Sequence, residues 1–482
     1  MKYAPSIMRS APLGLAALLC SGIAVAAAVA GGASAGVDAA RLPRAEAVIR
    51  EEMKVQQIPG LAFAVVDHGK VILAQGYGYA NVEHSVPVIT DTVFQSGSVG
   101  KQFTSAAVML FVEGGRLSLD DPITRYLPEA PPEWADIRIH HLLTHTSGIR
   151  DYGYEASYDT RRAVTEDELV RMACAQPLEF LPDERYSYSN TGYLLLGAIL
   201  DRLGGRHYSE VLRERIFEPL GMKSARLIDE AAIVPHRAAG YRLRDGHVAN
   251  QQWVAPEQNT TADGSLYLSI NDMIAWDQGL RAGRILSAAS WHKVYTPVTL
   301  LSGNTYPYGF AWEVSTSNGQ EVYAHSGGVP GFATYIVRYL GDDLSLIVLT
   351  NLEDADPERI ARRVAGVLRD DLRTPDPHPI ADAEPARHAV LEQLLQRARA
   401  GTLTASDLPH VRGGFQPSNA TGYRSQLDGL GDLQSLALVV RDRLGDDEHS
   451  QYLATFSRGR RLVDYTVDGH GDTVDLDIDL AD

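Results

Sequence analysis

Ser98 and Lys101 form an S-x-x-K pair, and the apolar residues that follow recur at helical spacing. A helix is therefore expected to begin close to Ser98, with Lys101 one turn later on the same face. The free N–H groups and positive dipole end at the start of a helix favour a developing negative charge. Burial and that positive end would lower the pKa of the Lys101 amine, so that it helps to remove the Ser98 proton. The pair predicts a serine nucleophile with a lysine base.

Two other motifs fail at this stretch. A phosphate-binding loop, G-x-x-x-x-G-K-[ST], would need glycine in place of Gln95 and serine or threonine in place of Gln102. A nucleophile elbow, G-x-S-x-G, would need glycine in place of Ser96. The remaining alternative is a helix-capping serine beside a solvated lysine, and the S-x-x-K spacing alone does not exclude it.

Two further motifs lie downstream. Tyr188-Ser189-Asn190 opens a helix that is expected over residues 190–203, so Tyr188 and Asn190 would project from a loop at the rim of a helical subdomain. His325-Ser326-Gly327-Gly328 ends a predicted strand at a glycine-rich turn. This turn would place His325 and the Gly328 N–H at the edge of a sheet.

With S-x-x-K, Y-x-N and H-x-G in that order, the chain resembles the serine hydrolases that include penicillin-binding proteins and class C β-lactamases, with D-aminopeptidase and esterase relatives. The resemblance covers roughly residues 45–372. It implies that Ser98 attacks a carbonyl and becomes acylated, while Lys101 and Tyr188 share the proton transfers. Because a phenol ordinarily titrates near ~10, Tyr188 would need the Lys101 charge beside it to act as a base.

The same resemblance implies a substrate-binding and oxyanion region made by Asn190, His325, Gly327 and Gly328. Asn190 would donate to the substrate's amide carbonyl and hold Lys101. The N–H groups of Ser98 and Gly328 would form the oxyanion hole, in which each donor typically contributes about 3 kcal/mol in the transition state. The resemblance implies no cofactor and no metal.

His325 departs from the family pattern, because β-lactamases of this type carry lysine there. This departure makes the chain more similar to the peptidase, amidase and esterase members. If His325 faces the substrate, its charge should change near its ordinary pKa of about 6.5, and donors with a free carboxylate should gain from the protonated form. The alternative is a structural histidine that is hydrogen-bonded inside the sheet.

His141 and His145 are four residues apart and could share a helix face as metal ligands. No glutamate lies between them as H-E-x-x-H requires, and no third ligand is suggested nearby. A structural role, in which both rings cap or bridge buried backbone, is the preferred interpretation.

Residues 1–35 have the pattern of a secretory signal. Lys2 and Arg9 precede a long apolar run, and Ala33-Ser34-Ala35 supplies the small residues of a cleavage site. The run is also near the roughly 20 residues that span a bilayer, so an uncleaved anchor is the alternative. Cleavage would give a periplasmic or secreted protein with no stable membrane association.

The rest of the chain predicts an α/β (α+β) protein. Strands near both ends of residues 36–372, with helices between them, imply an antiparallel sheet flanked by helices and an inserted all-helical subdomain. Residues 373–384 form a proline-rich linker, and residues 385–482 form a small C-terminal α+β domain without a catalytic motif. The linker predicts that this domain is dispensable for the chemistry. The expected helices are 38–55, 167–175, 190–203, 208–220, 270–280, 356–372 and 386–400, and the expected strands are 61–67, 71–76, 308–314, 321–326, 332–340, 344–350, 436–440, 451–456, 462–467 and 474–478.

The formal net charge of −17 argues against a nucleic-acid or anionic-membrane partner. The expected partner is a small-molecule or peptide substrate, and the sequence names no partner for the C-terminal domain. The leading hypothesis is an exported serine hydrolase that acts through an acyl-enzyme on small amides, peptides (including D-amino-acid-containing ones) or esters. A penicillin-binding sensor that is acylated with little turnover, and a non-catalytic binding module, remain as alternatives.

Overall fold

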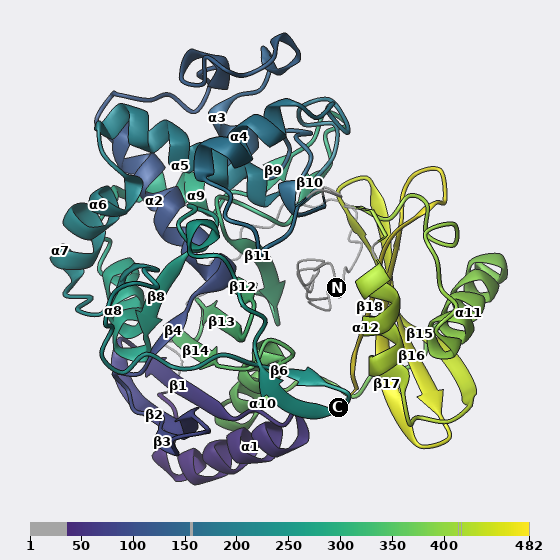
Figure 1. The fold of residues 1–482 in the computed structure, drawn as a ribbon. Coiled ribbons are helices and arrows are strands. Elements are labelled where there is room, and N and C mark those ends of the chain that lie inside the picture. Colours follow the sequence, from purple (N-terminus) through teal and green to yellow (C-terminus); the bar gives the residue numbers. More distant parts are fainter. Residues whose placement is uncertain (1–35, 155–157, 413, 416, 482) are drawn as a thin grey trace, which may run out of the picture.

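The computed structural model describes residues 36–154, 158–412, 414–415 and 417–481; the predicted secretory signal lies outside them. The central feature is a seven-stranded antiparallel sheet with the order β11-β12-β13-β14-β1-β2-β3 (Figure 1). β1 pairs with β14, with Leu61 opposite Thr350, so the two ends of the segment 36–372 share one sheet. The fold class is therefore confirmed. The strands are β1 (Gly60–Asp67), β2 (Lys70–Asn81), β3 (Val86–Pro87), β11 (Glu313–Ser317), β12 (Gln320–Val329), β13 (Phe332–Tyr339) and β14 (Leu344–Thr350).

Helices cover both faces of this sheet. α1 (Leu42–Val55) and α10 (Pro357–Leu368) pack on one face, and α2 (Lys101–Glu113) and α8 (Ile270–Arg281) lie on the other (Figure 1). Side chains of β1 alternate between the two cores, with Phe63 in one and Ala64 in the other. Because both faces of β1 are buried, its sequence is a continuous apolar run rather than an alternating one.

The inserted subdomain contains the helices expected over 167–175, 190–203 and 208–220, along with short helices and short strands that were not expected. The expected helix over 208–220 is interrupted by a π-helical turn, Arg213–Phe217, and the helix expected over 190–203 ends at Gly205, which has a φ of +68°. The remaining helices of this domain are α3 (Ile139–Leu143), α4 (Glu166–Cys174), α5 (Asn190–Gly204), α6 (Tyr208–Leu212), α7 (Glu218–Leu220) and α9 (Ala288–Val294). The short strands are β4 (Val93–Gln95), β5 (Arg226–Leu227), β6 (Tyr241–Arg244), β7 (His247–Asn250), β8 (Leu266–Ser269), β9 (Val298–Thr299) and β10 (Thr305–Tyr306).

The prediction of a strand over 308–314 is wrong for residues 308–312. β11 begins only at Glu313, because the backbone turns at Ala311, where φ is +62°. Phe310, Ala311 and Trp312 are nevertheless buried. These residues form a buried turn. A buried turn needs apolar side chains as a buried strand does, so its sequence resembled that of a strand.

The C-terminal domain has its own core beneath a four-stranded meander, β15 (Leu433–Leu444), β16 (Asp447–Phe456), β17 (Gly459–Val467) and β18 (Thr473–Leu480). Helix α11 (Pro385–Ala400) was expected, whereas α12 (Pro417–Leu427) was not. The sequence of α12 is mainly polar and carries no clear apolar stripe, so periodicity could not reveal it.

Within the described residues, no helix has both the length and the apolar character that a membrane crossing requires.

Candidate active site

Ser98 lies in a tight turn between β4 and α2. The turn is a 3-10 helix over Gly97–Gly100, and the α-helix begins at Lys101. Gly97 has a φ of +51°, a conformation that favours glycine, and this residue turns the chain out of β4. A helix start close to Ser98 is thus confirmed, although the first turn is 3-10 rather than α.

Lys101 is fully buried and points at the nucleophile. Its Nζ donates to Ser98 Oγ at 2.9 Å, to Asn190 Oδ1 at 2.8 Å and to the Asp263 carbonyl at 2.5 Å. Burial lowers the pKa of Lys101 to about 8, although the nearby charges of Asp263 and Asp151 act in the opposite direction. A neutral Lys101 is therefore accessible at mildly alkaline pH and can accept the Ser98 proton.

Tyr188 faces the same hydroxyl from the loop before α5, and Lys101 Nζ lies 5.0 Å from the centre of its ring. Its hydroxyl is buried and makes no regular hydrogen bond with another described residue, yet Ser98 is close enough to affect its ionisation. Burial raises the Tyr188 pKa well above 10, against the lowering effect of Ser98. This upward shift is opposite in direction to the one that a tyrosine base would need. The proton-transfer role expected for Tyr188 stays a prediction.

Asn190 is the first residue of α5 and connects this loop to Lys101. Its Oδ1 accepts the Lys101 ammonium hydrogen bond, and its backbone N–H donates to the Asp151 carboxylate. With Oδ1 engaged, the side-chain NH₂ is the donor that the amide offers to other groups. This arrangement agrees with the expected dual role of holding Lys101 and donating to a substrate carbonyl, which stays a prediction.

His325 is completely buried in β12 and takes part in a directional chain of hydrogen bonds. The Ser189 N–H donates to His145 Nδ1 at 3.1 Å, so His145 Nε2 carries the ring proton and lies 3.3 Å from the Tyr308 hydroxyl. Tyr308 donates to His325 Nε2 at 2.8 Å. His325 Nδ1 donates to the Ser326 carbonyl at 2.6 Å. His145, Tyr308 and His325 each accept one hydrogen bond and donate one, which is consistent with two neutral imidazoles.

The expectation that His325 changes its charge near neutral pH is therefore wrong. Burial lowers its pKa to about 3, and protonation of Nε2 would also break the hydrogen bond from Tyr308. The alternative stated above, a histidine hydrogen-bonded inside the protein, describes the ring better. His325 provides no fixed cation for a substrate carboxylate.

Replacing Tyr308 with phenylalanine should raise the pKa of His325 from about 3 toward its ordinary value. The hydroxyl stabilises only the neutral ring, so its loss should raise the pKa by about one unit or more. Histidine-labelled NMR titrations of wild type and Tyr308→Phe would measure this shift. Tyr323→Phe is the control, because the Tyr323 hydroxyl donates to Glu321 instead. An unchanged His325 titration in Tyr308→Phe would contradict the hydrogen-bond assignment.

Gly327 packs directly against the turn that carries Ser98. β11 pairs with β12 only as far as Ala324, and beyond that point β12 lies beside the nucleophile turn. A Cβ on Gly327 would be 2.3 Å from the Ser96 carbonyl oxygen, and a Cβ on Gly97 would be 2.7 Å from the Gly328 nitrogen. The structure thus brings Ser98, Gly327 and Gly328 together, while their oxyanion role stays a prediction.

We expect Gly327→Ala to reduce kcat by about 10²–10³-fold, because the added methyl group must push β12 away from the Ser98 turn. Steady-state kinetics on a small ester would measure this loss. Gly469→Ala is the matched control, since a Cβ there meets no atom within 4 Å. Equal rates for both variants would show that the close approach of β12 does not control catalysis.

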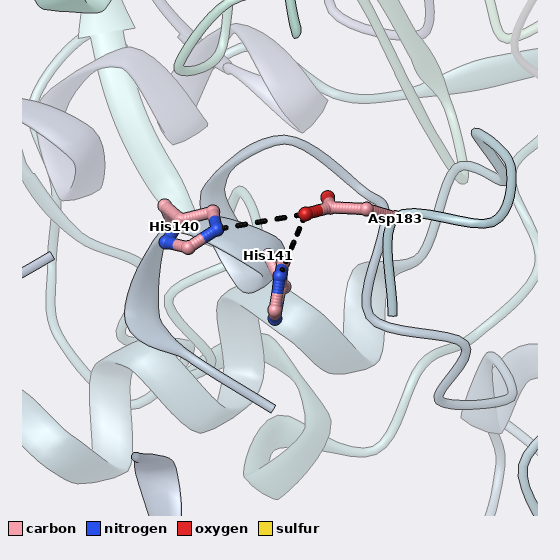
Figure 2. A group of neighbouring side chains, drawn as sticks. All are labelled: His140, His141 and Asp183. Atoms are coloured by element: carbon pink, nitrogen blue, oxygen red, sulfur yellow. Dashed lines mark hydrogen bonds and ion pairs between the residues drawn. The ribbon is translucent and has the colours of Figure 1, made fainter. Parts of the chain in front are cut away.

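His140, His141 and Asp183 form a compact cluster, and Asp183 reaches both rings (Figure 2). Asp183 Oδ2 lies 3.0 Å from His141 Nε2 and 3.8 Å from His140 Nε2. The Arg138 N–H donates to His141 Nδ1 at 2.9 Å, so the ring proton is on Nε2 and points at Asp183. A metal on Nε2 would need that proton to move to Nδ1, against the Arg138 N–H. The three side chains are therefore arranged as a hydrogen-bonded structural cluster, the clasp, and not as a metal centre.

The clasp and His145 hold the two ends of the loop over residues 183–189, the Tyr188 loop. The Asp183 N–H donates to the Thr146 carbonyl, and the Ser187 N–H donates to the His145 carbonyl, both at 2.9 Å. His145 Nδ1 accepts the Ser189 N–H. The structural role preferred for His141 and His145 is confirmed.

Three contributors to the site were not found from the sequence. Tyr308 orders His325, the Asp263 carbonyl holds Lys101, and Asp151 anchors the start of α5. None belongs to a short motif, and each becomes a neighbour only through contacts between distant segments. No signal in the sequence pointed to them.

A sequence model of the beta-lactamase family matches residues 45–369, which is most of the chain. The chain belongs to the beta-lactamase family. The resemblance inferred from the three motifs is therefore confirmed, and this family assignment supports a hydrolase.

Two curated relatives are similar to part of this beta-lactamase family member. Penicillin-binding protein 4* of Bacillus subtilis (strain 168) is 32% identical over 305 residues, covering 59% of this chain and 66% of that protein. A D-aminopeptidase of Gluconobacter oxydans (strain 621H) is 31% identical over 327 residues, covering 64% and 59%. The match thus spans less than two thirds of either relative's length.

A solved structure shares the fold of this family member over more of its length. The octameric penicillin-binding protein homologue from Pyrococcus abyssi superposes with a TM-score of 0.62 and 24% identity, covering 91% of this chain and 98% of that chain.

Proposed function

We propose that this protein is an exported serine hydrolase that forms an acyl-enzyme on Ser98 with small amides, short peptides or esters. The observation that carries the proposal is the contact between a fully buried lysine, its pKa lowered to about 8, and the Ser98 hydroxyl 2.9 Å away. A capping serine beside a solvated lysine would show neither burial nor this contact. A buried base beside a hydroxyl at a helix start is the arrangement that activates a serine.

The proposed reaction has two halves. Ser98 Oγ attacks the carbonyl carbon while its proton passes to neutral Lys101, and the N–H groups of Ser98 and Gly328 stabilise the resulting oxyanion. The tetrahedral intermediate then breaks the bond to the amine or alcohol, which leaves with a proton returned from Lys101, through the Tyr188 hydroxyl. Water repeats the sequence on the ester of Ser98 and releases the acid.

The neutral state of His325 supports amide and ester donors over β-lactams. A β-lactam antibiotic carries a carboxylate, and a neutral imidazole with both nitrogens engaged offers it no cation. The similarity to a D-aminopeptidase supports donors with a D-residue.

A panel of chromogenic esters, D- and L-amino-acid amides and cephalosporins tests this function. We expect turnover of esters and D-amino-acid amides, and cephalosporin hydrolysis slower by about 100-fold or more. Burst labelling without turnover on every donor would instead support the penicillin-binding sensor. Faster hydrolysis of cephalosporins than of amides would contradict the proposed substrate class.

Export is the localisation part of the proposal and rests on the pattern of residues 1–35. Fractionation of the native host, followed by mass spectrometry, should find a protein that begins at or near Gly36 outside the cytoplasm. A full-length chain in the cytosolic fraction would contradict export, and a full-length chain in the membrane fraction would support the uncleaved anchor instead.

A further inference from the structure

The C-terminal domain touches the catalytic domain at the tip of its β15–β16 hairpin, and also where Arg359 Nη1 of α10 donates to the Leu480 carbonyl of β18. The Gly445 N–H donates to the Thr305 carbonyl at 3.1 Å, and Asn304 Nδ2 donates to Asp446 Oδ1 at 2.6 Å. In Figure 1 the C-terminal domain approaches the catalytic domain beside β10. A Cβ on Gly445 would lie 2.8 Å from Leu300 Cδ1, so the tip is seated closely on the β9–β10 hairpin.

The β9–β10 hairpin in turn supports the Tyr188 loop at two points. The Tyr306 ring stacks on Tyr186, two residues before Tyr188, with centroids 3.7 Å apart and ring planes at 8°. The Leu301 N–H donates to the Asp183 carbonyl at 2.8 Å. Any displacement of this hairpin would therefore be transmitted to the loop that carries Tyr188.

The segment after β10 also reaches the third motif. Tyr308 follows Tyr306 by two residues and donates its hydroxyl proton to His325 Nε2. Residues 305–308 thus contact the tip of the C-terminal domain at one end and His325 at the other. A single short segment connects this domain with both the Tyr188 loop and β12.

Charge complements these contacts. Asp447, next to the tip, is an ion-pair partner of Arg412, and its side chain is only 9% exposed. The positive charge of Arg185, which belongs to the Tyr188 loop, also acts on the Asp447 carboxyl. Burial has the larger effect and raises the Asp447 pKa, while the Arg185 charge lowers it, so the Tyr188 loop lies near enough to the tip for that charge to act there.

We infer that the C-terminal domain is a positioning element for catalysis. Through residues 305–308 it holds the Tyr188 loop and His325 in their positions beside Ser98. This inference rests on the proposed hydrolase function. It replaces the expectation, drawn from the linker alone, that the C-terminal domain is dispensable for the chemistry. Tyr306 and Gly445 are the positioning residues, and neither touches the reacting atoms.

Two glycines in hairpin turns of the full-length protein provide the main test. Gly445 and Gly471 both have positive φ, +64° and +86°, but a Cβ on Gly471 meets no atom within 4 Å. Gly445→Val should lower kcat by about 10-fold with KM within about 2-fold of wild type, since small displacements of catalytic groups are costly. Gly471→Val also forces a β-branched residue into positive φ, without a contact at its Cβ, and should keep the wild-type kcat.

Hydrogen exchange gives a readout that does not depend on activity. Peptides that contain residues 183–190 should exchange faster in Gly445→Val than in Gly471→Val or wild type. Tyr306→Ala should reproduce the loss of kcat, and Tyr306→Phe, which keeps the stacked ring, should restore it. The Tyr306 variants test the path from the hairpin to the loop. Asn304→Ala, which removes the hydrogen bond to Asp446 from the catalytic-domain side, should also lower kcat and tests the contact with the C-terminal domain where Gly445→Val does not fold.

Equal kcat and equal exchange in Gly445→Val and wild type would overturn the inference. An equal loss in Gly471→Val would also overturn it, because destabilisation of the domain would then explain the effect. Failure of the proposed function looks different: wild type itself would hydrolyse no donor in the panel, whereas the exchange comparison would still report on the contact.

Discussion

Ser98→Ala is expected to lower kcat/KM by at least about 10⁴-fold and to abolish labelling by a fluorophosphonate probe. Ser98 is the hydroxyl that Lys101 Nζ contacts at 2.9 Å, in the turn that leads into α2. Without this oxygen no acyl-enzyme can form, and only binding and oxyanion stabilisation remain. Kinetics and gel-based labelling of purified protein measure both effects.

Ser105→Ala is the matched control for this substitution. Ser105 is buried on the same helix, and its hydroxyl has no hydrogen-bond partner among the described residues. The control should label like wild type. Labelling that persists in Ser98→Ala but disappears in Ser96→Ala or Ser189→Ala would show that the nucleophile has been assigned to the wrong serine.

Lys101→Met should fold and yet lose about 10³-fold in the rate of acylation. Methionine fills the buried space of the lysine stem but cannot accept a proton. Wild-type acylation should rise with pH through about 8, because Lys101 must be neutral to act as a base and is protonated below that pH. Lys101→Met should lose this rise along with the rate.

The control for Lys101 is Lys293→Met, which removes an exposed cation on α9. It should preserve both the rate and the pH profile. Wild-type acylation that stays level between pH 6 and 9 would show that Lys101 is not the base. A profile that rises only above pH 10 would instead favour Tyr188, whose pKa is raised well above 10.

Local sequence patterns predicted most elements of the catalytic domain. The buried run of β1, the amphipathic α1 and the helix after Ser98 each follow from the spacing of a few neighbouring residues. The segment from Tyr308 to Trp312 was misread, since the turn at Ala311 has no local marker that periodicity detects. The same segment carries Tyr308, whose hydrogen bond to His325 no local pattern predicts.

The sequence by itself determined the motifs Ser98-x-x-Lys101, Tyr188-x-Asn190 and His325-x-Gly327, since each depends on neighbours along the chain. Only the tertiary structure decided their electrostatics. Burial by distant segments lowers the pKa of Lys101 to about 8 and that of His325 to about 3, and it raises that of Tyr188 well above 10. Desolvation and long-range hydrogen bonds, such as those from Lys101 to Asp263 and from Tyr308 to His325, arise only when the chain has folded. The contact between Gly445 and Thr305 has the same origin, because residues 140 positions apart meet only in the folded protein.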